Sequence, residues 1–111
     1  MKIEKGFVKK IISKIVGLEK YITDFAIHSK NLKTYDATEK LLSLIEEKNN
    51  LVLNLKIIKG FMQELSGENV ALFSLYFVKG VDVSKLNMKC SMRQRFRKIA
   101  KLRQMLEEKL L

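Results

Sequence analysis

The sequence contains no proline and no tryptophan, and its 111 residues include only five glycines. β-Sandwiches and barrels need turn-forming residues between many short strands, so this scarcity argues against both architectures. Apolar residues make up 47% of the chain and charged residues 31%, a balance that is sufficient for a folded core. Lysine, leucine and glutamate are abundant, and all three favour helices. We therefore predict an all-α protein.

Cysteine and histidine each occur once, as Cys90 and His28. One cysteine excludes a disulfide within the chain, and one cysteine with one histidine makes no recognisable metal-binding set. The sequence also has no glycine-rich phosphate loop, no nucleophile paired with a base and no credible pair of catalytic carboxylates. We expect no metal, no cofactor and no enzymatic activity.

Long apolar runs are also missing. The longest, Val70–Val78, has nine residues, about half the length that a membrane-spanning helix needs. Near the N-terminus, Lys9, Lys10 and Lys14 interrupt the apolar residues, which predicts that no signal peptide is present. Together with the lone cysteine, this predicts a soluble cytoplasmic protein with no membrane partner.

Positive charge is abundant and concentrated at the two ends of the chain. The net charge is +10. Residues 1–33 carry eight basic and three acidic side chains, and residues 83–111 carry nine and two, whereas residues 34–82 are slightly acidic. A clustered basic excess favours a polyanionic partner, either nucleic acid or an anionic membrane surface.

Helical periodicity divides residues 1–66 into two long segments. Apolar residues recur at helical steps over Ile3–Leu32, with Gly6 and Gly17 inside the pattern. The sequence Asp36-Ala-Thr-Glu39 matches a capping box, which would open a second helix that reaches Leu65. Residues 51–58 also alternate like a strand, but no partner strand is evident. We predict a long helical hairpin or coiled coil that serves packing and dimerisation.

Residues 67–111 are predicted to form a helix, a short helix, a turn and a final helix, on a core continuous with the hairpin. The first helix, Glu68–Lys79, is apolar nearly all round and ends at Gly80. Asp82 or Ser84 can cap the short helix. The sequence Ser91-Met-Arg-Gln94 is a second capping box, from which the last helix can run to the C-terminus.

The last helix is predicted to have one apolar side and one basic side. The core side comprises Met92, Phe96, Ile99, Leu106 and Leu110, with Ala100 and Leu102 at its margins. Between Val83 and Leu106 there are eight basic residues and no acid. A basic helix face is usually only solvated, but such faces normally mix Glu with Lys, so the absence of acids favours a binding surface.

These residue types suit the recognition of double-stranded DNA. Arginine can donate two hydrogen bonds to guanine, glutamine can pair with adenine, and lysine contacts phosphate. We predict that the DNA-contacting residues are Lys85, Lys89, Arg93, Gln94, Arg97, Lys98, Lys101 and Gln104.

Residues 68–106 resemble a known family. The sequence Leu75-Tyr-Phe-Val-Lys-Gly80, followed by Val83, Leu86 and the Arg93–Leu106 segment, looks like the helix-turn-helix of the fourth conserved region of bacterial sigma factors. It is especially similar to small phage and mobile-element regulators that carry this module. Lys85-Leu86-Asn87 stands where the family has Glu-Ile-Ala, and the turn is one or two residues shorter, depending on the alignment. The resemblance implies sequence-specific DNA binding and contact with RNA polymerase.

The leading functional prediction is a homodimeric, DNA-binding transcription regulator of phage or mobile-element type. One alternative is a helical-bundle protein-interaction or immunity-type factor whose basic faces keep it soluble. A second alternative takes residues 7–22 as a basic amphipathic helix that lies on an anionic membrane surface.

Overall fold

The structure is a computed structural model that describes residues 2–28, 35–86 and 88–110. Its elements in chain order are α1 (Phe7–His28), α2 (Tyr35–Glu64), α3 (Glu68–Phe73), η1 (Ser74–Val78), η2 (Val83–Lys85) and α4 (Met92–Glu107). No residue in the described ranges lies in a strand, and residues 51–58 are helical. The predicted all-α class is confirmed. The predicted end of the first helix at Leu32 lies outside the described residues.

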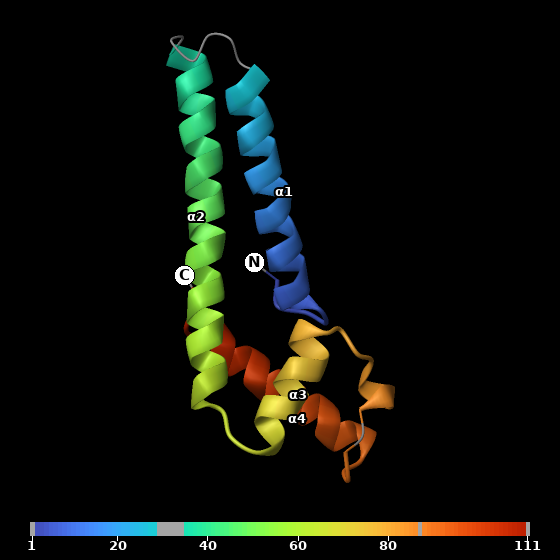
Figure 1. The fold of residues 1–111 in the computed structure, drawn as a ribbon. Helices are drawn as coiled ribbons and strands as arrows, with labels where there is room; N and C mark the ends of the chain where they lie inside the picture. The colour runs from blue at the N-terminus through green and yellow to red at the C-terminus, as the bar shows by residue number, and fades with distance from the viewer. Residues whose placement is uncertain (1, 29–34, 87, 111) are drawn as a thin grey trace.

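The two long helices α1 and α2 form an antiparallel hairpin, and α3, η1 and α4 gather at its base (Figure 1). The molecule measures 60 × 24 × 19 Å and has a radius of gyration of 18.1 Å. A compact chain of this length has a radius of about 13 Å, so the hairpin extends well beyond the core. The predicted long N-terminal hairpin is confirmed.

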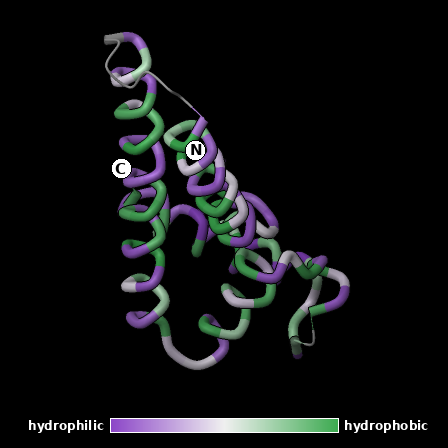
Figure 2. The backbone as a smooth tube through the Cα atoms, turned by 45° about the horizontal axis from the view of Figure 1, so that its top comes forward, coloured by the Kyte–Doolittle hydropathy of each residue, from purple (hydrophilic) through white to green (hydrophobic). Residues whose placement is uncertain are grey.

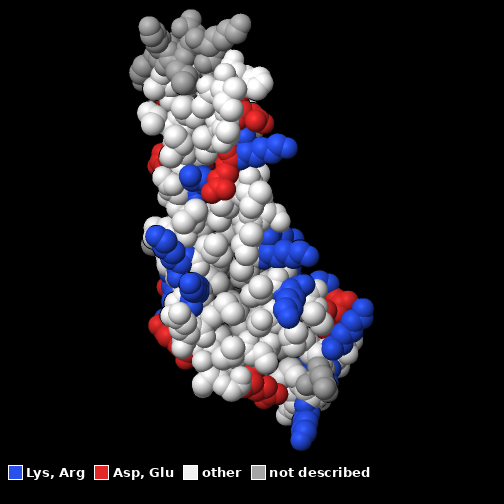
Figure 3. All heavy atoms as spheres, in the orientation of Figure 1, with Lys and Arg blue, Asp and Glu red and all other residues white. Residues whose placement is uncertain are grey.

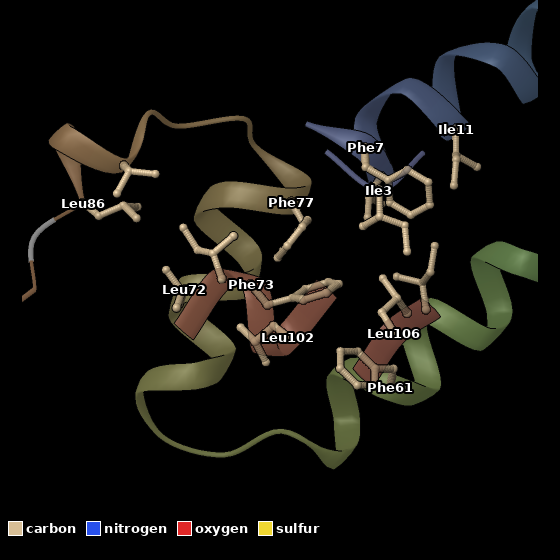
Figure 4. Packing of buried hydrophobic residues seen from close by; sticks show 14 of the residues in the cluster. Ile3, Phe7, Ile11, Phe61, Leu72, Phe73, Phe77, Leu86, Leu102 and Leu106 are labelled. Atoms are coloured by element: carbon tan, nitrogen blue, oxygen red, sulfur yellow. The ribbon is translucent and has the colours of Figure 1, made fainter. Parts of the chain in front are cut away.

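The core lies at the base of the hairpin and draws on both halves of the chain (Figure 4). Phe73 and Phe77 are completely buried, and the Phe73 ring lies 5.4 Å from the Phe61 ring and 5.0 Å from the Phe77 ring between centroids. In Figure 2, hydrophilic and hydrophobic residues alternate along the backbone of α1 and of α2. The residues of 1–66 and 67–111 thus share one buried cluster.

The N-terminus of α1 docks on the end of η1 through two glycines. Gly6 precedes α1 with φ +72°, instead of lying inside a helix as the periodicity predicted. Its N–H donates to the Tyr76 carbonyl oxygen at 2.9 Å. Gly80 ends η1 with φ +73°, and a Cβ added to Gly80 would lie only 3.4 Å from the Gly6 Cα. The positive φ at both positions favours glycine, and the two glycine backbones lie close together.

Three further elements differ from the sequence prediction in their bounds or in their helix type. Asp36 lies inside the first turn of α2, because α2 begins at Tyr35, so Asp36 is not the N-cap. The predicted helix Glu68–Lys79 is α3 continued by the π-helical turn η1, which closes where the Lys79 N–H donates to the Ser74 carbonyl oxygen at 3.0 Å. The short helix before α4 is the single turn η2, three residues long.

Candidate nucleic-acid interface

A capping box fixes the start of α4. The Ser91 hydroxyl accepts from the Gln94 backbone N–H, and the Ser91 N–H donates to the Gln94 Oε1, both at 3.3 Å. This confirms the cap predicted from the sequence. It also engages one lone pair of the Gln94 amide oxygen and leaves the amide NH2 group without a role in the cap.

The buried face of α4 is rotated from the predicted one. Ile99, Leu102 and Leu106 are buried, but Phe96 is 55% and Met92 42% exposed. The prediction that these last two face the core is wrong. The half-buried Arg95 lies beneath this end of α4 instead, between the helix and residues 83–88.

Two of the four arginines hold the fold together. Arg95 donates from its guanidinium to the Val83 carbonyl at 3.2 Å and to the Met88 carbonyl at 2.9 Å. The Arg103 Nε donates to the Ile3 carbonyl at 2.8 Å. Sequence reasoning missed both roles. The available signal was their spacing, because residues 95, 99 and 103 are four apart and share one side of a helix.

Arg93 and Arg97 lie on the opposite, exposed side of α4. Within the described part of the chain, neither guanidinium has a hydrogen bond or an ion pair, so both are free to bind a ligand. Lys85, Lys89, Lys101 and Gln104 are also exposed. In Figure 3, Lys and Arg side chains project at the lower right of the face, where Figure 1 places η2 and the start of α4, and also further up beside α1.

Lys98 differs from the other predicted contacts because it is engaged with α3. Its Nζ donates to the Glu68 Oε2 at 3.1 Å, and the residue is half-buried. At the other end of α4, the Lys109 Nζ pairs with the Glu64 Oε2 at 2.7 Å. These two ion pairs link the C-terminal helix and the residues after it to α3 and α2, and contact of Lys98 with DNA stays a prediction.

A hollow of about 350 Å³ lies beside the N-terminal end of α4. Phe96 and Met92 form part of its wall, and an ion pair between Lys5 and Asp82 lies at its edge. The hydrogen bond from Lys5, together with the positive charge of Lys5, lowers the pKa of Asp82 below its ordinary value. The same hydrogen bond and the negative charge of Asp82 raise the pKa of Lys5. Both groups are therefore charged near neutral pH, and the pair contributes no net charge to the hollow.

Other types of site find no support in the described ranges. These ranges contain no group of three or more His, Cys, Asp or Glu side chains suited to hold a metal ion. No described helix combines the length and apolar character needed to cross a membrane. Phe7, Ile11 and Ile15 of α1, which a membrane-surface helix would have to expose, are instead buried in the core.

Comparison of the chain with protein-family models, curated proteins and solved structures finds no match. The resemblance to sigma factors therefore rests on the residues quoted above, and function has to be argued from the surface of α4.

Proposed function

We propose that this protein is a cytoplasmic, non-enzymatic transcription regulator that binds double-stranded DNA through the exposed side of α4. The observation that supports the proposal is the pair of unengaged guanidinium groups, Arg93 and Arg97, on a helix that carries no acid before residue 107. A helix of 16 residues is about 24 Å long and fits a major groove about 12 Å wide.

The exposed basic residues divide into two groups on this surface. Arg93 and Arg97, with Gln104 two turns further on, are suited to contact base edges. Lys85, Lys89 and Lys101 flank them and are suited to contact phosphates. Contact with RNA polymerase is supported by the sigma-factor resemblance alone.

Replacing both Arg93 and Arg97 with alanine is expected to weaken binding to a mixed-sequence duplex by about 30-fold or more, because each arginine contact contributes about 1–3 kcal/mol. Fluorescence anisotropy with a labelled duplex measures this. The matched control is Lys56→Ala/Lys59→Ala, which removes the same charge from exposed positions on α2 and is expected to change affinity by less than about threefold. Equal losses in the two double variants would contradict the proposal.

The homodimer in this proposal is supported by an apolar face on the hairpin. Lys14 of α1 and Glu47 of α2 form an ion pair at 3.5 Å across one face. Val16 lies two residues after Lys14, and Ile45 lies two residues before Glu47. This spacing places both residues on the opposite face of the hairpin. Val16 is 59% exposed and Ile12, one turn away, is 44% exposed. Large aliphatic side chains grouped in this way indicate an interface.

Charge on the same face is self-complementary, which favours a second copy of the chain as the occupant. Glu19 lies one turn from Val16 toward the tip of the hairpin, and Lys48 lies one turn from Ile45 toward its base. A two-fold axis through Val16 and Ile45 would therefore bring Glu19 of each copy to the level of Lys48 on the neighbouring helix of the other copy.

We expect Val16→Glu to convert a dimer, with twice the 12.9 kDa mass of the chain, into a monomer, because it adds a charge to the apolar centre of the interface. Sedimentation equilibrium measures the mass, and Tyr21→Glu, an exposed position near the Lys14 side of α1, is the control. Glu19→Lys is expected to weaken the dimer and Glu19→Lys/Lys48→Glu to restore it. A wild-type protein that is monomeric at all concentrations would rule out this interface.

The alternative function, a helical-bundle interaction or immunity-type factor, is favoured by other exposed apolar residues on the hairpin, Ile27 and Leu42. It predicts that the protein captures a protein partner and leaves duplex DNA unbound even at low salt.

A further inference from the structure

The N-terminal half of α4 exposes an aromatic and a thioether side chain. The Met92 Sδ accepts a hydrogen bond from the Arg95 Nη1 at 3.6 Å. Phe96 and Met92 are both well exposed and lie next to each other along the wall of the 350 Å³ hollow, together with Tyr76 and Val83. Single exposed apolar residues are ordinary, but a group of them around a depression indicates a contact surface.

The position of Phe96 connects this surface to the basic one. Residues 93, 96, 97 and 100 follow the i, i+3, i+4, i+7 spacing, so Arg93, Phe96, Arg97 and Ala100 share one side of α4. All four are exposed. A polyanion attracted to the two guanidinium groups must therefore also come close to the Phe96 ring, and the small Ala100 leaves room for this approach.

The hollow suits an apolar group better than it suits a phosphate. The charges at its edge, Lys5 and Asp82, are paired with each other, so the hollow attracts no anion by net charge. In the major groove of DNA, the exposed apolar group is the C5-methyl of thymine. The acceptor atoms of a base edge are favoured beside Arg93 and Arg97, and a methyl group is favoured beside Phe96 and Met92.

We propose that Phe96, assisted by Met92, contacts the C5-methyl groups of thymine in the major groove, and so gives the protein a preference for methylated pyrimidines. This inference rests on the proposed DNA binding and adds a determinant of specificity to it. Burial of one methyl group corresponds to about a fourfold gain in affinity.

Two alternating duplex polymers test the proposal without knowledge of a target sequence. Poly(dA-dT) and poly(dA-dU) differ only in the thymine methyl group. The wild-type protein is expected to bind poly(dA-dT) about fourfold or more tightly, and Phe96→Ala is expected to bind both polymers alike. Met92→Ala is expected to retain part of the preference. Leu42→Ala, which removes an exposed apolar side chain from α2, is expected to retain all of it.

The outcomes separate this inference from the proposed function. Equal wild-type affinity for the two polymers, with binding still dependent on Arg93 and Arg97, would overturn the methyl contact and leave DNA binding standing. A preference that persists in Phe96→Ala would also overturn it, since the discrimination would then come from the duplex itself. Absence of binding to either polymer at low salt would overturn both proposals. Because Phe96 is exposed, an unchanged unfolding midpoint in Phe96→Ala verifies that the variant is folded.

Discussion

Phe73→Ala is expected to lower the free energy of unfolding by about 3–5 kcal/mol. The ring is completely buried and packs between Phe61 of α2 and Phe77 of η1. Its removal leaves a cavity at the point where the hairpin meets the C-terminal helices, and the surrounding side chains can fill it only in part. For a domain whose total stability is about 5–15 kcal/mol, this is a large fraction.

Urea denaturation measures this effect as a lower midpoint with an unchanged slope. The matched control is Phe96→Ala, which deletes the same atoms from an exposed position and is expected to change stability by less than about 0.5 kcal/mol. Similar losses in the two variants would contradict the burial of Phe73, and with it the shared core of the two halves.

The second large effect is expected from Gly80→Val. Gly80 has φ +73° and would direct a new Cβ to within 3.4 Å of the Gly6 Cα. The left-handed conformation costs about 1–2 kcal/mol for a residue with a side chain, and displacement of Gly6 would weaken its hydrogen bond to Tyr76, worth about 1 kcal/mol. We expect a loss of about 2–3 kcal/mol or more, and a fall in Tm of roughly 10–20 °C.

Gly80→Ala separates conformational strain from the close approach. The Cβ of alanine would lie in van der Waals contact with the Gly6 Cα at 3.4 Å, whereas the branched side chain of valine extends beyond it. Gly80→Ala is therefore expected to show only the strain of about 1–2 kcal/mol. If Gly80→Ala is as destabilising as Gly80→Val, then the contact between Gly6 and Gly80 contributes nothing measurable.

The helices of this fold could be predicted from the sequence because they follow from local pattern. Apolar spacing gave the hairpin, and the Ser91–Gln94 box gave the start of α4. Gly6 could not be placed in this way, because its conformation depends on Gly80, which is 74 positions away in the sequence. Periodicity reports which face of a helix is apolar, and it carries no information on where two distant backbones meet.

The candidate site was predictable for Arg93 and Arg97 but not for their neighbours. A helical wheel assigned Met92 and Phe96 to the core because they are apolar, and it gave no role to Arg95 or Arg103. The structure instead places Arg95 and Arg103 beside the buried face, where each binds backbone carbonyl groups. The location of carbonyl acceptors depends on tertiary packing, so sequence alone does not separate a structural arginine from one that is available to a ligand.

The salt dependence of duplex binding tests the central claim most directly. Each phosphate contact contributes about −0.9 to the slope of log affinity against log salt concentration. We predict a steep slope for the wild type, a slope shallower by about 1–2 for Lys89→Ala/Lys101→Ala, whose side chains we assign to phosphates, and the wild-type slope for Lys56→Ala/Lys59→Ala. The same slope in all three proteins would contradict the assignment of DNA binding to the exposed side of α4.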